Sequence, residues 1–391
     1  MSILGVPPAL PRPALPPVLN IGYANWGECG DGKIEAAAAN GVNLVIWFAL
    51  SLVLGDRGEP LIKGGPNLTC VARTAALLEK RGLPTTHFIS IGGWSAPHPS
   101  PTLSAPTWWG AFAAYDAQAE AAGLRGGFDG IDWDLEGSDT RSSPSNTFDP
   151  ATLRLVSDLS VLAKASGKYV SLAPPQSYLD CTTPEFSFSL LHSARCWRGG
   201  SNGSEFAYAG RNAYAALLAL APSGTYDFIS LQLYESYSIA SCMLTERRTP
   251  LASYLASLVQ SMHAGWEVGF DREPLLGLGN RTVRVARTSL VIGLANGWTR
   301  PGGKALFVKP DELAHAWRTA LTPEARARPR GFMFWDVSDE GKVPTEGAPP
   351  LYLARQLNAF LHTRPRGRLV APPGVVERGT LDSPRAQGDV T

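Results

Sequence analysis

Residues 127–136 read Gly-Phe-Asp-Gly-Ile-Asp-Trp-Asp-Leu-Glu, and this acidic stretch says most about fold and function. A β-strand alternates its faces residue by residue, so Asp132, Asp134 and Glu136 share one face and the apolar residues between them share the other. Burial and like charge raise the pKa of neighbouring carboxyl groups, which is a cost in a purely structural strand. General acid catalysis uses a carboxyl group that stays protonated near neutral pH. The stretch therefore predicts an acid-catalytic site on a strand.

A metal site is the first alternative for these carboxylates, because their spacing partly matches the start of an EF-hand calcium loop. The twelfth position of such a loop needs a bidentate Glu, and here it is Ser143. The six histidines are scattered along the chain without an HExxH motif. A surface acidic loop, the second alternative, does not account for the alternating apolar residues. We predict no metal and no cofactor.

The rest of the chain alternates apolar, strand-like runs with Ala- and Leu-rich segments of helical period. Eight such pairs in strict alternation predict an α/β fold, a single (β/α)8 TIM barrel. A doubly wound sheet is the structural alternative, but polar residues end several different strands, as a barrel site requires. The expected strands are residues 19–25, 43–50, 86–92, 127–136, 169–173, 227–234, 289–295 and 331–337.

The two ends of the chain differ from this pattern. Residues 1–18 are Pro-rich and are expected to form an extended N-terminal lead-in to a catalytic barrel over residues 19–362. Residues 363–391 are polar, aperiodic and rich in Pro and Gly, which predicts a flexible C-terminal tail.

Composition excludes several classes of protein. The chain is 44% hydrophobic and 18% charged, so it can bury a large core and has no disorder signature. A net charge of +1 argues against a nucleic-acid or anionic-membrane binder, which needs a basic surplus. No apolar run reaches the ~20 residues of a membrane span. The start lacks the charged and apolar regions of a signal peptide.

Five cysteines without a CxxC pair leave two interpretations, inert thiols or disulfide-linked loops in an oxidising compartment. Cys181 and Cys196 share the loop after the fifth strand and are the expected pair in the second case. Glycosylation sequons at Asn67, Asn202 and Asn280 also favour a secreted or lumenal protein.

The run Asp129-Gly-Ile-Asp132-Trp-Asp134-Leu-Glu136 resembles the DGxDxDxE signature of family 18 glycoside hydrolases, the chitinases and their relatives. Other motifs resemble the family in the right order: SxGG at Ser90, Gly92 and Gly93, APQ at Ala173-Pro-Pro-Gln176, QxY at Gln232-Leu-Tyr234, the strand-eight Trp at Trp335 and the inward aromatic of strand one at Tyr23. The matches span about residues 19–340 and are similar to the shorter plant-type and bacterial members without the α+β insertion.

The resemblance implies a retaining hydrolase of β-1,4-linked N-acetylglucosamine polymers, in which the substrate's own acetamido group assists. Glu136 would protonate the glycosidic oxygen, and Asp134 would hydrogen-bond the acetamido N–H and share a proton with Asp132. Tyr234 would hold the acetamido oxygen, and Trp335 would form the apolar floor under the sugar.

The remaining site residues fall into two groups. Those expected to line the substrate are polar or aromatic residues at strand ends, where flat rings suit pyranose faces: Gln232, Tyr23, Gln176, Trp94, Trp298 and Trp26. Those expected to be structural are Asp129, which would cap the turn before its strand, and Ser90, Gly92 and Gly93. Glu235 departs from the family, because the shorter members often have Asn there.

Two other functions share these motifs. An endo-β-N-acetylglucosaminidase acting on N-glycans, or a lysozyme-like enzyme, would use the same acidic strand. A non-catalytic chitinase-like lectin is the non-enzymatic alternative, but such relatives usually lose the acid, and Glu136 is present. We expect a monomer whose partner is a polysaccharide.

Overall fold

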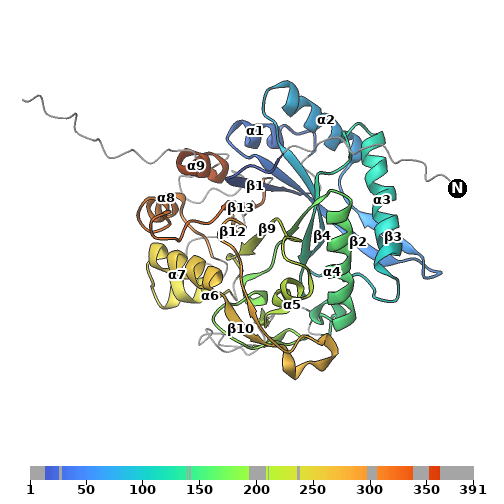
Figure 1. The fold of residues 1–391 in the computed structure, drawn as a ribbon. Helices are drawn as coiled ribbons and strands as arrows, with labels where there is room; N and C mark the ends of the chain where they lie inside the picture. Colours follow the sequence, from blue (N-terminus) through green and yellow to red (C-terminus); the bar gives the residue numbers. More distant parts are fainter. Residues whose placement is uncertain are drawn as a thin grey trace, which may run out of the picture. The chain divides into compact units, whose positions relative to one another are not determined.

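Eight parallel strands close into a barrel in the computed structural model of the chain (Figure 1). The strands follow the order β1-β13-β12-β9-β6-β5-β4-β2, and β1 also pairs with β2, which closes the ring. The predicted TIM barrel is confirmed. The barrel strands are β1 (Leu19–Ala24), β2 (Leu44–Leu54), β4 (Thr86–Gly93), β5 (Gly130–Leu135), β6 (Tyr169–Leu172), β9 (Phe228–Gln232), β12 (Leu290–Ala295) and β13 (Gly331–Trp335).

The structure describes residues 14–25, 29–138, 140, 142–192, 208–209, 211–235, 238–296, 306–337 and 352–361. All elements named below lie in one unit, Met1–Leu361. Most of the lead-in and all of the tail lie outside the described residues, so the boundaries at residues 18 and 362 stay predictions.

Helices surround the strands (Figure 1), and several begin at a residue whose side chain caps the first turn. The side chain of Asn67 accepts from the Cys70 amide, and that of Ser104 accepts from the Thr107 amide. The Asp149 side chain, just before Pro150 at the first helical position of the next helix, accepts from the Ala151 amide. The helices are α1 (Lys33–Ala39), α2 (Leu68–Lys80), α3 (Ala105–Ala121), α4 (Pro150–Ala165), α5 (Ala213–Leu220), α6 (Ile239–Ser241), α7 (Leu251–Ala264), α8 (Pro310–Thr319) and α9 (Tyr352–Leu361).

Buried apolar side chains form two layers, one inside the barrel and one between the strands and the helices. The inner layer includes Ile46, Phe88 and Met333. The outer layer includes Trp133, which donates from Nε1 to Ser160 Oγ on α4 over 2.9 Å. Because the apolar residues of β5 face outward, its acidic residues face the barrel axis, as the alternation predicts.

Three short antiparallel pairs extend the barrel and were not expected from the sequence. β3 (Pro60–Gly64) pairs with the end of β2, β7 (Leu191–His192) pairs with β8 (Tyr208–Ala209), and β10 (Trp266–Gly269) pairs with β11 (Asn280–Val283). Apart from β2, these strands have two to five residues, which is too short for a period-two pattern to distinguish them from loops.

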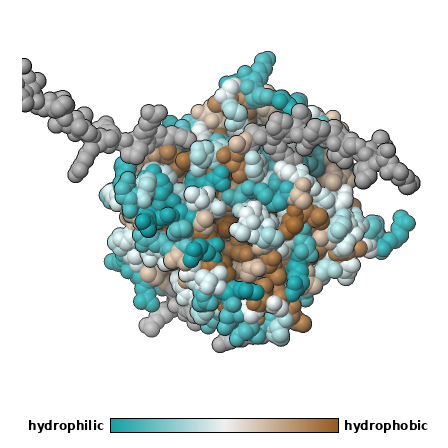
Figure 2. All heavy atoms as spheres, in the orientation of Figure 1, coloured by the Kyte–Doolittle hydropathy of each residue, from teal (hydrophilic) through white to brown (hydrophobic). Residues whose placement is uncertain are grey.

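Hydrophilic residues cover much of the face that Figure 2 shows, and apolar residues gather toward its middle. Within the described part of the chain, no helix combines the length and the apolar character needed to cross a membrane.

The predicted pairing of Cys181 with Cys196 is wrong. Cys181 is a free, partly buried thiol, whereas Cys29 and Cys70 form a disulfide, and Cys242 is also disulfide-bonded. Sequence spacing favoured two cysteines of one loop. The barrel instead brings the loop after β1 beside the start of α2, 41 residues along the chain.

We predict that replacing both Cys29 and Cys70 with Ser lowers the free energy of unfolding by about 2–4 kcal/mol, because the unfolded chain gains the freedom that the closed loop removed. Chemical denaturation under oxidising conditions measures the change, with Cys181→Ser as the matched control that removes a free thiol. Equal stability of the double variant and wild type would contradict the prediction.

Candidate active site

The carboxyl groups of β5 rise in three steps through the barrel interior. Asp132 is fully buried, Asp134 is 4% exposed, and Glu136, one residue beyond the strand, is 6% exposed. The period of the strand thus places one carboxyl deep inside the barrel and two nearer its carboxyl-terminal end, where TIM-barrel active sites lie.

The deepest carboxyl, Asp132, is surrounded by hydroxyl donors from three other strands. Its Oδ2 accepts from Tyr23 Oη at 2.7 Å and from Ser90 Oγ at 3.1 Å, and its Oδ1 accepts from Ser171 Oγ at 2.6 Å. Burial raises the pKa of Asp132, and the three hydrogen bonds oppose that rise because they favour the charged form. Ser171 on β6 has the same function as Ser90, but no motif in the sequence distinguished it.

The outer two carboxyls, Asp134 and Glu136, are hydrogen-bonded to each other. Burial raises the pKa of both groups well above their usual ranges, and the charge of Asp132 adds to the rise for Asp134, as the charge of Asp134 does for Glu136. A hydrogen bond between two carboxyl groups needs a proton on one of them, because two carboxylates have no hydrogen to share. The pair therefore holds at least one proton.

Gln232, the last residue of β9, two strands along from β5, donates to this pair. Its Nε2 lies 2.8 Å from Asp134 Oδ1, 3.4 Å from Glu136 Oε1 and 2.7 Å from the Ala173 carbonyl oxygen. The short bond to Asp134 and the long one to Glu136 favour the charge on Asp134. The Gln232 Oε1 atom is buried and has no protein partner among the described residues, so it is open to a donor from a ligand.

Tyr234 and Glu235 follow Gln232 at the end of β9 and complete the charged cluster. The Tyr234 ring belongs to the inner apolar layer, and its pKa is raised by burial first and by the charge of Glu136 next, so it remains a neutral O–H donor. The charge of Glu235 raises the pKa of Glu136, Asp134 and Tyr234. Glu235 stood out in the sequence only as a departure from the family, but in the structure it lies close enough to raise the pKa of the acid.

The paired glycines at the end of β4 allow this strand to run close to the acidic strand. A Cβ at Gly92 would lie 2.3 Å from the Asp134 carbonyl oxygen, and one at Gly93 would lie 2.3 Å from the Phe48 ring. Both residues also have φ above +100°, a conformation that side chains disfavour. The Ser-x-Gly-Gly sequence thus supplies both a donor to Asp132 and space for Asp134.

Trp335 ends β13 among other aromatic rings and is partly exposed. Its ring centroid lies 5.7 Å from that of Tyr23, with tilted planes, and 4.6 Å from that of Phe48, edge to face. Tyr23 also donates to Asp132, so one side chain contacts both the Trp335 ring, which we call the aromatic floor, and the deepest carboxyl group. Phe48 was not predicted; its position near the end of an apolar strand gave no signal of proximity to the site.

The other predicted residues occupy different surroundings. Asp129 accepts from the His87 amide at 2.8 Å and so joins the turn before β5 to β4. Gln176 is buried, donates to Tyr254 Oη and accepts from the Ala240 amide, so both ends of its amide bond protein groups. Trp94 is 40% exposed beyond β4. Trp26 and Trp298 lie outside the described residues.

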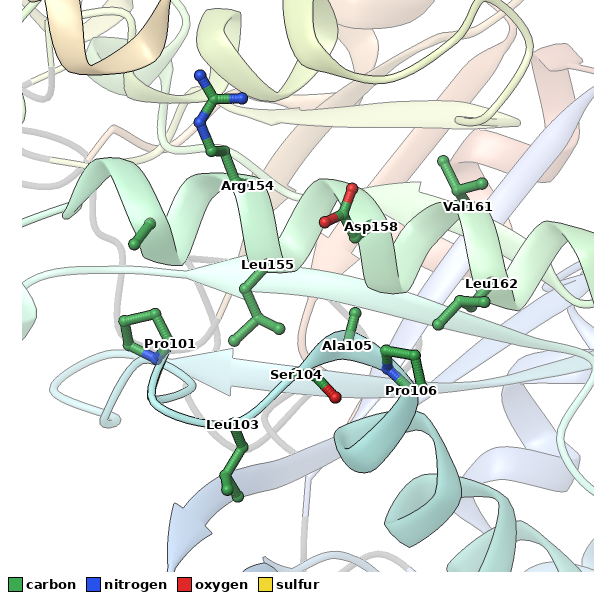
Figure 3. A pocket seen from close by; sticks show the side chains of 11 residues that line it. Pro101, Leu103, Ser104, Ala105, Pro106, Arg154, Leu155, Asp158, Val161 and Leu162 are labelled. Carbon is green, nitrogen blue, oxygen red and sulfur yellow. The ribbon is translucent and has the colours of Figure 1, made fainter.

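The described part of the chain holds no second centre of this kind. Among the described residues, no group of three or more His, Cys, Asp or Glu side chains is arranged to hold a metal ion. A groove of about 580 Å³ lies between the segment before α3 and helix α4 (Figure 3), lined mainly by apolar residues with Arg154 and Asp158 on α4. It contains none of the predicted site residues.

Solved structures of glycosyl hydrolase family 18 share this fold. A fungal endo-β-N-acetylglucosaminidase of that family matches with a TM-score of 0.50 and 14% identity over 89% of this chain and 99% of that one. A family 18 chitinase from Pseudoalteromonas aurantia matches with a TM-score of 0.50 and 13% identity over 88% of this chain and 98% of that one. No protein-family model and no curated protein matches the chain. At these identities the likeness establishes the fold.

We predict that Glu136→Gln raises the free energy of unfolding at pH 7–8 by about 1–3 kcal/mol, because it removes the cost of ionising a buried group. The pKa of Glu136 is raised in the folded protein, so wild type loses stability as pH rises above the ordinary value of 4.5. The gain should disappear below that value. Denaturation at several pH values tests this, with exposed Glu120→Gln as control; a gain that does not vary with pH would contradict it.

Proposed function

We propose that the protein is a retaining glycoside hydrolase that cleaves β-1,4-linked N-acetylglucosamine polymers. The observation that carries the proposal is the buried, hydrogen-bonded carboxyl pair of Glu136 and Asp134, on the strand where family 18 enzymes place their acid. Burying two carboxyl groups side by side costs stability, and a protein that only binds sugar does not need a protonated acid there.

The proposed reaction uses two chemical steps. Glu136 donates its proton to the glycosidic oxygen while the substrate's acetamido oxygen attacks C1, so the C1–O bond breaks and a cyclic oxazolinium ion forms. Asp134 accepts a hydrogen bond from the acetamido nitrogen and stabilises the cation, and Tyr234 donates to the acetamido oxygen and aligns it for attack. Water then adds at C1 and returns a proton to Glu136, with retained configuration.

The substrate class rests on the neutral charge of the chain and on the aromatic floor. An uncharged polysaccharide needs no basic surface, and a net charge of +1 is in keeping with that. The partly exposed Trp335 ring offers an apolar face to a pyranose ring. An N-glycan is the second candidate, because an endo-β-N-acetylglucosaminidase shares the fold as closely as a chitinase does.

We also propose a secreted or lumenal location. The Cys29–Cys70 disulfide supports it, because such bonds persist in oxidising compartments. The protein would act there as a monomer.

We predict that wild type releases β-anomeric products from chitin oligosaccharides and that Glu136→Gln lowers kcat by about 10²–10⁴-fold, the usual contribution of a general acid. Proton NMR during the reaction reads the anomer, and mass spectrometry of digests of chitin oligomers, glycopeptides and peptidoglycan fragments identifies the substrate. Sugar binding without turnover on any substrate would leave the lectin alternative, and unchanged kcat in the variant would refute the assigned acid.

We predict that Glu235→Gln moves the alkaline limb of the kcat/KM profile to lower pH. The charge of Glu235 raises the pKa of Glu136, and activity falls as Glu136 deprotonates, so removing that charge brings the fall to lower pH. The pH profile of the variant is compared with that of exposed Glu246→Gln, which should match wild type. A limb that stays in place would show that Glu235 does not act on the acid.

A further inference from the structure

Glu136 lies on a stretch of main chain beyond the point where the neighbouring strand β6 ends. The last residue of β6, Leu172, lies opposite Trp133, and the final main-chain bond across this edge runs from the Ala173 amide to the Trp133 carbonyl. The backbone from Leu135 onward must find other hydrogen-bond partners, because buried peptide groups are costly when unpaired.

Side chains from other elements supply those partners. Tyr214 Oη on α5 accepts from the Leu135 amide at 2.6 Å, Tyr178 Oη accepts from the Gly137 amide at 3.2 Å, and Asn146 Oδ1 accepts from the Ser138 amide at 2.7 Å. These three bonds fix the neighbours of Glu136 rather than Glu136 itself.

His98, in the loop between β4 and α3, contacts Glu136 directly. Its Nε2 lies 3.1 Å from the Glu136 carbonyl oxygen, and its Nδ1 lies 3.2 Å from the Thr147 carbonyl oxygen. The imidazole ring packs against Phe148, with 4.6 Å between ring centroids. One ring therefore joins the two ends of the segment 136–147 that leaves the acidic strand.

Only one of these two carbonyls can receive a hydrogen from a neutral ring. Burial lowers the pKa of His98 from its ordinary value of 6.5, so near neutral pH the imidazole is uncharged and carries one N–H. The bond to Glu136 and the bond to Thr147 thus belong to different tautomers, and the two can be separated by substitution.

The side chain of Glu136 depends on its own main chain for position. Its contact with Gln232 is long, at 3.4 Å, and its partner Asp134 lies on the same strand. A carboxyl that must reach the glycosidic oxygen loses rate when it is displaced by a fraction of an ångström.

We propose that His98 is a positioning residue for the catalytic acid, acting through an Nε2–H bond to the Glu136 carbonyl oxygen. The role rests on the proposed function, because it concerns the orientation of Glu136 toward a glycosidic bond. The histidine appeared in the sequence as one of six scattered residues, and only the fold places it beside the acid.

Two isosteric substitutions separate the contacts. In His98→Gln the side-chain amide nitrogen can occupy the position of Nε2 and bond Glu136, whereas in His98→Asn it can occupy the position of Nδ1 and bond Thr147 only. His315→Gln, at an exposed position on α8, is the control for the exchange itself. Each variant is assayed on chitin oligosaccharides, its thermal unfolding is measured, and the Glu136 carboxyl is titrated by ¹³C NMR without substrate.

We expect His98→Asn to lower kcat about tenfold with little change in KM, as loss of one hydrogen bond near the acid would do. His98→Gln should stay within about twofold of wild type at similar thermal stability. The Glu136 titration should shift in the Asn variant and not in the Gln variant.

Full activity and an unshifted Glu136 titration in His98→Asn would overturn the proposal. It would also be overturned if both variants lost the same amount of activity and that loss followed their loss of thermal stability. If wild type cleaves no glycan, the proposed function fails. The NMR titration still tests the positioning role in that case, because it needs no turnover.

Discussion

The structure is organised around one constraint: three carboxyl groups on one face of a buried strand cannot all be charged. Asp132 and Asp134 face the barrel interior, and Glu136 follows one residue beyond the strand. Burial raises the pKa of each group, and repulsion from a neighbouring carboxylate adds to the rise for Asp134 and Glu136, so at least one proton must stay in the cluster. The hydrogen bonds around the cluster decide where that proton resides.

The hydrogen bonds that the carboxyl groups receive become fewer and longer from the interior of the barrel toward its carboxyl-terminal end. Asp132 receives three hydroxyl bonds, Asp134 receives one short amide bond from Gln232, and Glu136 receives a long one. Support for the charged form therefore weakens toward the outermost group, which retains the proton. A closed barrel is suited to this task, because its strands aim side chains at one axis from several directions.

Much of this arrangement could be predicted from the sequence. The alternation of β5 predicted the inward acidic face, and the SxGG motif singled out Ser90 as structural, which the structure places as a donor to Asp132. Ser171, Phe48 and His98 could not be predicted, because nothing local marks them and their roles depend on which strands and loops the barrel makes adjacent. The cysteine pairing was missed for the same reason, and the short antiparallel strands were missed because they are too short to show a period-two pattern.

From the short bond that Gln232 donates to Asp134 and the long one to Glu136, we infer that the resting protein holds a protonated Glu136 beside an ionised Asp134. The most direct measurement is a ¹³C NMR titration of the carboxyl carbons in protein labelled at Asp and Glu, with Glu136→Gln and Asp134→Asn used for assignment. We expect the Glu136 carboxyl to remain protonated at pH values well above its ordinary pKa of 4.5. A Glu136 carboxyl that titrates at or below that value would contradict it.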